Sequence, residues 1–141
     1  MEITLICPVK PTEDIKRVKI AFENLLGKSD FIISEIDAES EISASLANRD
    51  DVSFIRQAIH EARIIDAARK RLESNWNGTS TLMHFDKQAA FLRKLKIIDD
   101  NQELPPLGGI ELIVSFDSEQ EFYDFVNWFT PPTKDGKIIS S

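Results

Sequence analysis

Residues 110–129, IELIVSFDSEQEFYDFVNWF, join a strand pattern directly to a helix pattern. Apolar side chains recur at every second position from Ile110 to Phe116, which predicts a half-buried strand. Ser118 and Glu121 then have the spacing of a capping box, and the phenylalanines that follow recur at helical spacing. The stretch therefore predicts a strand with one apolar face beside an amphipathic helix.

The same two periodicities extend outward from this stretch in both directions. They predict strands at 3–8, 31–37, 39–46, 79–85 and 92–98, and helices at 13–26, 50–73 and 87–91. Helices and strands do not alternate strictly, and most strands are apolar on one face only. This pattern favours an α+β fold of two layers, with an antiparallel or mixed sheet and helices packed on one face. The length of 141 residues is typical of one domain, which we expect to span residues 1–141.

Composition indicates an ordinary globular protein, with 42% hydrophobic and 29% charged residues. The single cysteine, Cys7, has no partner for an internal disulfide, as is usual in a reducing compartment. The apolar start of the chain, residues 1–9, is too short for a secretion signal, and no apolar run approaches the roughly 20 residues of a membrane span. We therefore expect a soluble, cytoplasmic protein without a membrane partner.

The distribution of charge is more informative than the net charge of −7. Residues 1–52 carry a net charge of −5, residues 53–98 carry +5, and residues 99–141 carry −7. The middle third is therefore a basic segment between two acidic ones. Such asymmetry favours a polyanionic partner for the middle segment, whereas the acidic segments would repel one.

Five short motifs occur one after another along the chain. They are PTED at 11–14, IIDAAR at 64–69, DKQAA at 86–90, PLGGI at 106–110 and NWFTPPTKDG at 127–136. Together they resemble an uncharacterised archaeal protein family whose fold is similar to that of the ribosomal protein that binds 5S ribosomal RNA. The resemblance covers nearly the whole chain. It implies RNA binding, association with an RNA-processing complex such as the exosome, and no catalytic residue.

The chain departs from the usual family pattern at three positions. Asp86 stands where the family usually has Asn, and Gly109 stands where Pro is common. Pro132 lies where a basic residue is usual. The changes at Asp86 and Pro132 reduce positive charge, so they weaken the expectation of RNA contacts at those two points.

The predicted helix at 50–73 carries a first group of candidate RNA-binding residues. Arg56, His60, Arg63 and Lys70 have the spacing of one helix face. A basic stripe of this kind can follow a phosphate backbone, because each neutralised phosphate releases a counterion. The alternative is a solvated helix face whose arginines pair with acidic residues of the same helix.

A second group surrounds the KQAA sequence. Lys87, Arg93, Lys94 and Lys96 would concentrate positive potential there, and Gln88 could donate a hydrogen bond to a base or a sugar. The alternative is a helical turn that packs its alanines against the sheet and leaves its lysines in water.

Aromatic side chains could stack on unpaired bases. Most phenylalanines, Phe54 among them, lie at positions whose periodicity is typical of a core. Trp76 and Phe91 are less periodic and lie in the basic segment, so they are the predicted stacking residues.

Catalytic and metal chemistry find no support in the residue pattern. His60 and His84 lack the spacing of metal ligands, and no glycine-rich phosphate loop follows a strand. We therefore expect no enzyme activity, no metal and no cofactor.

These observations lead to one hypothesis and one alternative. The hypothesis is an RNA-binding accessory protein that uses a basic face made of Arg56, Arg63, Lys70, Lys87, Gln88, Arg93, Lys94 and Lys96. The alternative is a protein–protein interaction module, or a domain that forms a homodimer through an exposed strand edge, without nucleic acid.

Overall fold

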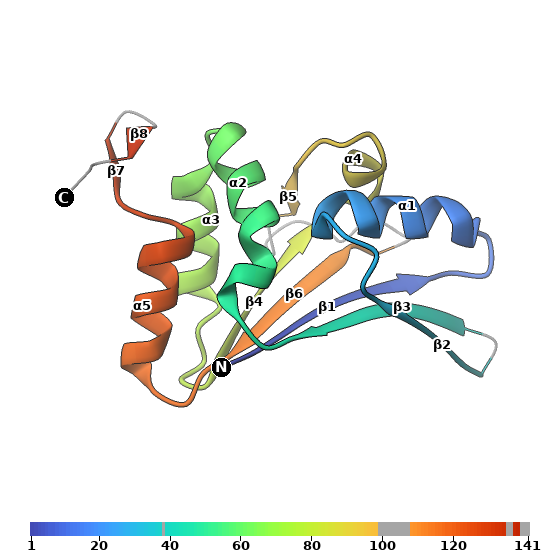
Figure 1. Ribbon diagram of the computed structural model, residues 1–141, viewed down its shortest axis with the longest axis horizontal. Helices are drawn as coiled ribbons and strands as arrows, with labels where there is room; N and C mark the ends of the chain where they lie inside the picture. Colours follow the sequence, from blue (N-terminus) through green and yellow to red (C-terminus); the bar gives the residue numbers. More distant parts are fainter. Residues whose placement is uncertain (38, 99–107, 135–136, 139–141) are drawn as a thin grey trace.

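Six strands form one antiparallel sheet in the computed structural model of the chain, which describes residues 1–37, 39–98, 108–134 and 137–138 (Figure 1). The order across the sheet is β2-β3-β1-β6-β4-β5. The strands are β1 Glu2–Val9, β2 Ile32–Ile36, β3 Glu39–Leu46, β4 Ser80–Phe85, β5 Ile97–Ile98 and β6 Ile110–Ser115. A separate hairpin joins β7 Thr133–Lys134 to β8 Lys137–Ile138.

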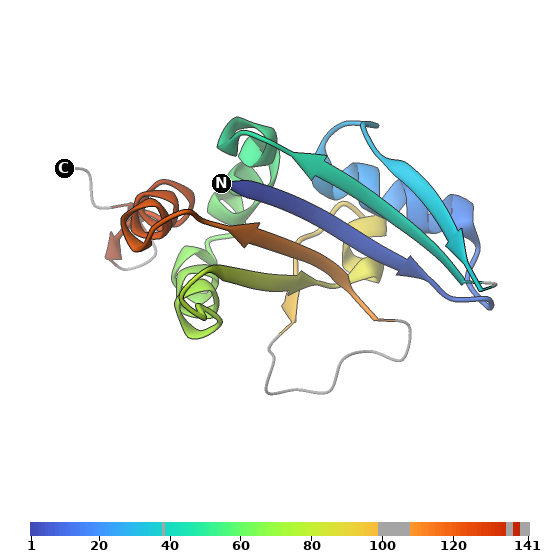
Figure 2. The same ribbon diagram turned by 90° about the horizontal axis from the view of Figure 1, so that it is seen from below.

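The helices are α1 Ile15–Leu26, α2 Ser53–Glu61, α3 Ile65–Ser74, α4 Lys87–Phe91 and α5 Glu119–Phe129, with a 3-10 turn at Arg49–Val52 before α2. Figures 1 and 2 show α1, α2 and α4 over one face of the sheet, and α3 and α5 toward the end where β1 begins. No described helix covers the opposite face (Figure 2). The predicted α+β fold with two layers is confirmed.

Strand register explains which side chains form the core. Leu5 of β1 lies opposite Ala44 of β3 and Leu112 of β6, and all three are buried. Because side chains alternate along a strand, the next residues, such as Thr4 and Ile113, are paired on the open face and stay partly exposed. The helices contribute aliphatic and aromatic side chains to the same core.

Two predicted elements were wrong in extent. The helix predicted at 50–73 is broken into the 3-10 turn, α2 and α3, with the break at Ala62–Ile64. The strand predicted at 92–98 is reduced to β5, because Arg93 has a φ of 60° and turns the chain before the strand can begin. In each case a residue in the left-handed region, where extended and helical backbone cannot continue, ends the regular structure.

The helix caps partly follow the prediction. The N-cap of α1 is Asp14, whose carboxylate accepts a hydrogen bond from Lys16 N at 2.9 Å, so the helix begins two residues later than the predicted start at 13. Gly27 ends α1 with a φ of 82°, as expected for a C-terminal glycine. Ser118 caps α5 by accepting a hydrogen bond from Glu121 N at 3.1 Å, whereas the Glu121 carboxylate accepts from Asp117 N.

Two of the sequence motifs lie partly outside the described residues. The PLGGI motif at 106–110 is described from Gly108 onward, and the NWFTPPTKDG motif at 127–136 is described up to residue 134. Gly109 lies close to the neighbouring strand, since a Cβ there would be 2.9 Å from the carbonyl oxygen of Phe85. Among the described helices, none is long and apolar enough to cross a bilayer.

The environment of Cys7 leads to a prediction about its reactivity. The thiol is buried in β1, and burial raises its pKa to about 12. Since the thiolate is the nucleophile, we expect almost no reaction of the native protein with a disulfide reagent such as DTNB at about pH 8. Unfolding in urea should release one reactive thiol per chain, measured by absorbance. Rapid reaction of the folded protein would contradict the buried position.

Candidate nucleic-acid interface

The eight candidate RNA-binding residues do not share one environment. Six are exposed, namely Arg63, Lys70, Gln88, Arg93, Lys94 and Lys96. Arg56 is partly buried, and Lys87 is buried. The candidate face is therefore smaller than the sequence suggested, and its members come from separate turns and helices.

Arg63 lies at the break between α2 and α3. Its φ is 59°, and two hydrogen bonds close the end of α2: Arg63 N donates to His60 O at 3.2 Å, and Ile64 N donates to Ile59 O at 3.3 Å. This pair of bonds is the Schellman motif, which usually has glycine where Arg63 stands. The break separates Arg56 on α2 from Lys70 on α3, so the predicted stripe along a single helix face is wrong.

Arg93 repeats this arrangement at the end of α4. Its φ is 60°, Arg93 N donates to Ala90 O at 3.0 Å, and Lys94 N donates to Ala89 O at 2.8 Å. The main chain of residues 93–94 therefore satisfies the last carbonyls of α4, and the side chains of Arg93 and Lys94 remain exposed.

Three basic residues of α2 and α3, namely Arg56, His60 and Arg69, contact the C-terminal end of α5. Arg56 Nε donates to Trp128 O at 2.7 Å, His60 Nε2 lies 3.1 Å from Phe129 O, and Arg69 Nη2 donates to Thr130 O. A helix leaves its last carbonyls without internal donors and has a partial negative charge at that end. Arg56 and Arg69 meet both needs, and His60 meets the need for a donor, so we assign all three a structural role.

Trp128 also fixes the position of Arg56. The guanidinium carbons of Arg49 and Arg56 lie 5.2 and 5.1 Å from the centre of the Trp128 ring, which is within the range of cation–π interactions. Burial, followed by repulsion from Arg49, lowers the pKa of Arg56. These contacts leave Arg56 partly buried against Trp128, and its role as a phosphate contact stays a prediction.

Lys87 belongs to a buried ion pair and not to the exposed surface. Its ammonium lies 3.0 Å from Glu13 Oε1 and donates to Pro8 O at 2.5 Å. The exposed fractions of the Lys87 and Glu13 side chains are 8% and 9%. Glu13 Oε1 also accepts from Lys10 N at 2.9 Å. The pair thus joins the end of β1 and the start of α1 to α4, and the prediction of Lys87 as a surface contact is wrong.

The aromatic residues also differ from expectation. Trp76 stacks on Phe122 of α5, with the ring centres 4.0 Å apart. Phe91 is partly buried, and the guanidinium of Arg17 lies 5.6 Å from its ring centre. Phe54, which the periodicity placed in the core, instead exposes 54% of its surface. Phe54 is therefore the residue that sequence reasoning missed.

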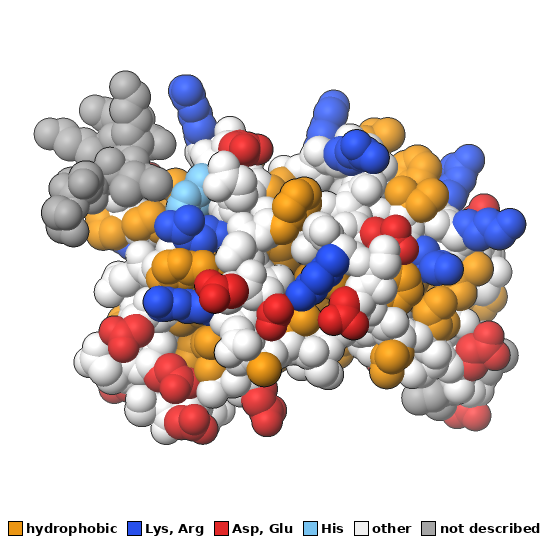
Figure 3. Space-filling model, viewed as in Figure 1, with side chains coloured by type: hydrophobic (Ala, Val, Ile, Leu, Met, Phe, Trp, Pro, Cys, Tyr) orange, Lys and Arg blue, Asp and Glu red, His pale blue; other side chains and the backbone are white. Residues whose placement is uncertain are grey.

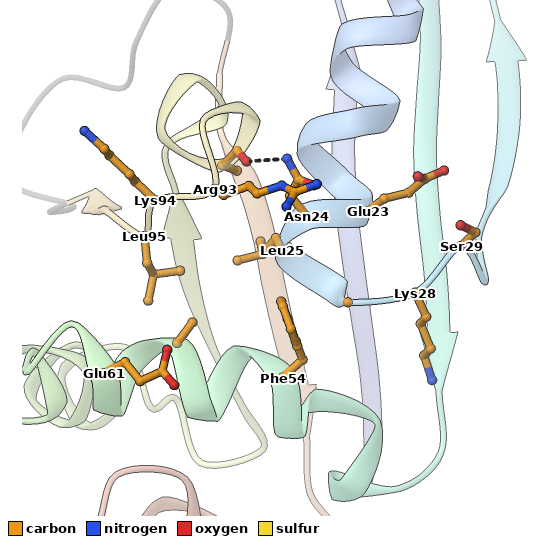
Figure 4. A pocket seen from close by; sticks show the side chains of 13 residues that line it. Glu23, Asn24, Leu25, Lys28, Ser29, Phe54, Glu61, Arg93, Lys94 and Leu95 are labelled. Carbon is orange, nitrogen blue, oxygen red and sulfur yellow. Dashed lines mark hydrogen bonds between the residues drawn. The ribbon is translucent and has the colours of Figure 1, made fainter.

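Phe54 lies in a pocket of about 440 Å³ between the end of α1, the helix α2 and the turn from α4 to β5 (Figure 4). Its lining is mixed and consists of Glu23, Asn24, Leu25, Gly27, Lys28, Ser29, Phe54, Ala58, Glu61, Ala90, Arg93, Lys94 and Leu95. Asn24 closes one side by donating to Ala90 O at 3.0 Å and Phe91 O at 3.2 Å. In Figure 4 the Phe54 ring points into the pocket, and Lys94 extends away from it.

Charged side chains are unevenly distributed over the visible surface. Figure 3 shows lysine and arginine side chains projecting along the border formed by α2, α4 and α1. Acidic side chains gather below α5 and near the turn between β2 and β3. We call the exposed side chains of Arg63, Arg93, Lys94 and Lys96 the basic rim. Among the described residues, no group of three or more His, Cys, Asp or Glu side chains could hold a metal ion.

Comparisons with known proteins agree on one relationship. A family model described as RNA binding matches residues 2–116. A UPF0201 protein of Sulfurisphaera tokodaii is 34% identical over 134 residues, covering 91% of this chain and 86% of that protein. A UPF0201 protein of Thermococcus kodakarensis is 30% identical, covering 98% and 95%. The crystal structure of the UPF0201 protein from Methanococcus jannaschii is 27% identical, with a TM-score of 0.83 and coverage of 99% and 100%.

The buried ion pair leads to a stability prediction. Replacing Glu13 by Gln removes the carboxylate that lies 3.0 Å from the buried Lys87 ammonium, and we expect the free energy of unfolding to fall by about 3 kcal/mol. Urea denaturation measures the change, with the exposed Glu35→Gln as control. The double variant Glu13→Gln/Lys87→Met should recover part of the loss, because it removes both charges. Equal stability of Glu13→Gln and Glu35→Gln would show that the pair contributes nothing.

Proposed function

The chain belongs to the UPF0201 family, and from this premise we propose that it binds RNA through phosphate contacts on the basic rim. The match to a family model described as RNA binding supports the class of ligand. The rim supplies the electrostatic component, since each phosphate neutralised by lysine or arginine releases a counterion and adds affinity that does not depend on sequence. This mode of binding requires no catalytic group and no metal.

The conformation of Arg63 and Arg93 is the observation that carries the proposal. Each is an exposed arginine in the left-handed region at the C-terminal end of a helix, a position that favours glycine. A residue with a Cβ in this region costs roughly 1–2 kcal/mol. Strain of this kind is concentrated at functional sites. A polyanion-binding surface is expected to have cationic side chains at both turns, even though glycine would avoid the conformational cost of the left-handed backbone.

The two turns approach each other around the pocket. Glu61, two residues before Arg63, lines the same pocket as Arg93 and Lys94. Figure 1 shows the turn from α2 to α3 and the turn from α4 to β5 on the same side of the molecule, above the sheet. Arg93 and Lys94 line the pocket, and Arg63 follows Glu61 by two residues, so cations from segments distant in the sequence could contact successive phosphates of one strand.

The open face of the sheet is less suited to RNA. Its described strand residues include four glutamates, Glu2, Glu39, Glu41 and Glu111, and no lysine or arginine. His84 on this face lies 2.9 Å from Glu111 Oε2. Carboxylates repel phosphate, so we place the RNA on the helical side.

The same open face favours the alternative of a protein–protein module. Ile32 of β2 lies opposite Ser43 on this face and exposes 65% of its surface. Ile6 of β1 and the paired Ile113 of β6 and Leu82 of β4 add apolar surface to this face, and all three are partly exposed. An apolar surface with acidic neighbours suits a basic protein surface.

Glycine substitutions test the basic rim without damage to the fold. In the double variant Arg63→Gly/Arg93→Gly we expect the free energy of unfolding to stay unchanged or to rise by up to about 1 kcal/mol, because glycine tolerates the left-handed backbone. Affinity for single-stranded RNA of mixed sequence should fall. The slope of log K against log salt should decrease by roughly 0.7 for each phosphate that the variant no longer neutralises. Filter binding at several salt concentrations measures both quantities.

The matched control removes two positive charges elsewhere. Lys16→Gln/Arg49→Gln gives the same net charge, but Lys16 lies in the first turn of α1 and Arg49 lies before α2. We expect its RNA affinity to remain close to that of the wild type. An equal fall in affinity in both double variants would indicate a general charge effect and would defeat the assignment to the rim.

A substitution at Ile32 tests the alternative function. If the open face mediates self-association, Ile32→Arg should shift the sedimentation coefficient toward that of a monomer. Its RNA affinity should not decrease, because Ile32 lies on the face away from the helices. A wild-type protein that sediments as a monomer at all concentrations would remove self-association from the alternative.

A further inference from the structure

The pocket around Phe54 has the features of a site for an unpaired base. We propose that it receives one base of a single-stranded RNA, stacked on the Phe54 ring, while the adjacent phosphates contact Arg93 and Lys94. This inference rests on the proposed function and deepens it, because it specifies single-stranded RNA and a preference among bases. The proposal starts from the exposure of a large aromatic ring inside a concave site.

Gly27 explains why the Phe54 ring is held in the pocket. A Cβ on residue 27 would lie 2.5 Å from Cγ of Phe54 and 2.8 Å from Cβ and Cδ1. Only glycine permits this contact, and only glycine readily adopts the φ of 82° at the end of α1. The ring is therefore supported by main chain on one side while 54% of the residue surface stays exposed. A supported, exposed ring is the arrangement that base stacking requires.

The dimensions and the apolar lining fit a flat heterocycle. The volume of about 440 Å³ lies within the usual range of small-molecule sites, roughly 300–1,000 Å³. Leu25, Ala58 and Leu95 add apolar surface around Phe54. In Figure 4 Leu25 lies above the ring, and Leu95 lies across the pocket beside Glu61.

Two carboxylates indicate which bases the pocket would favour. Glu23 and Glu61 line opposite sides, from α1 and from α2. A carboxylate accepts hydrogen bonds from the amino groups of cytosine, adenine and guanine, as in glutamate contacts to cytosine N4. Uracil has a carbonyl oxygen at the position of the cytosine amino group. We therefore infer a preference for bases with an amino group over uracil.

The same carboxylates orient the nucleotide. They disfavour a phosphate inside the pocket, whereas Arg93 and Lys94 attract one at its border. Figure 4 shows Arg93 extending from the turn after α4 toward Asn24 on α1, and Lys94 extending outward. The base would therefore enter the pocket and the backbone would follow the basic rim. A base inside a duplex is not available for this contact, which favours single strands.

Substitution of Phe54 tests the proposal against a matched aromatic residue. Tyr123 on α5 exposes 46% of its surface and lies outside the pocket. We expect Phe54→Ala to lower the affinity for a short oligocytidylate about tenfold, as for the removal of one stacked base, and Tyr123→Ala to have no effect. Affinity for double-stranded RNA should be equal in all three proteins. Phe54→Trp should retain binding, with its fluorescence quenched by the oligonucleotide.

Base preference gives a second measurement on the same surface. Glu61→Gln replaces a carboxylate by an amide that can also donate, so the preference for oligocytidylate over oligouridylate should shrink. The exposed Glu35→Gln is the control. An unchanged preference in Glu61→Gln would overturn the role of this carboxylate.

The outcomes separate this inference from the proposed function. If the wild type binds RNA with salt dependence and Phe54→Ala binds equally well, the pocket assignment fails while RNA binding stands. The assignment also fails if Phe54→Ala weakens duplex and single-strand binding alike. If the wild type binds no RNA, the proposed function fails, and a titration with cytidine monophosphate followed by NMR tests the pocket directly. Absence of shifts for Phe54, Ala58 and Leu95 would then overturn the site as well.

Discussion

The carbonyl groups at the C-terminal ends of the helices constrain the surface of this protein more than any other feature. Each helix needs donors for its last carbonyls. At α5 the donors are the side chains of Arg56, His60 and Arg69. At α2 and α4 they are main-chain amides of the turns that contain Arg63 and Arg93. A cation used as a cap is unavailable to a ligand, whereas a turn that caps through its main chain leaves its side chain exposed. This difference divides the basic segment into structural residues and candidate ligand contacts.

Local periodicity predicted the strands and most helices, because alternation and caps depend on neighbours in the sequence. The break at Arg63 was missed, since the Schellman turn there has no glycine or proline to mark it. The burial of Lys87 was missed because its partner, Glu13, lies 74 residues earlier. Phe54 has the spacing of a core residue, but the folded structure leaves 54% of its surface exposed. Of the predicted site, Arg63, Arg93, Lys94 and Lys96 form the basic rim, whereas Arg56 and Lys87 contact partners that are distant in the sequence.

A net charge of −7 is compatible with RNA binding because the open face of the sheet carries carboxylates and no described strand lysine or arginine, whereas the exposed cations of the basic rim lie on the helical side. Glu41 and Glu111 belong to the open face of the sheet, whereas Arg93 and Lys94 lie in a turn on the helical side. At physiological ionic strength the Debye length is about 8 Å, so charges separated by a sheet and a layer of helices are largely screened from one another. A phosphate on the basic rim therefore experiences the local potential and not the net charge. The acidic face would keep the RNA on the helical side.

Electrostatics alone would bind single and double strands alike, since both present phosphates. The pocket adds a requirement that only an unpaired base can meet, because a base must leave its stack to reach Phe54. The rigid main chain at Gly27 holds the ring before any ligand arrives, so little side-chain ordering is needed on binding. The carboxylate of Glu61 would then exclude the phosphate from the pocket and accept from the base. Affinity would thus come mainly from the basic rim, and selectivity for unpaired bases from the pocket that Arg93 and Lys94 border.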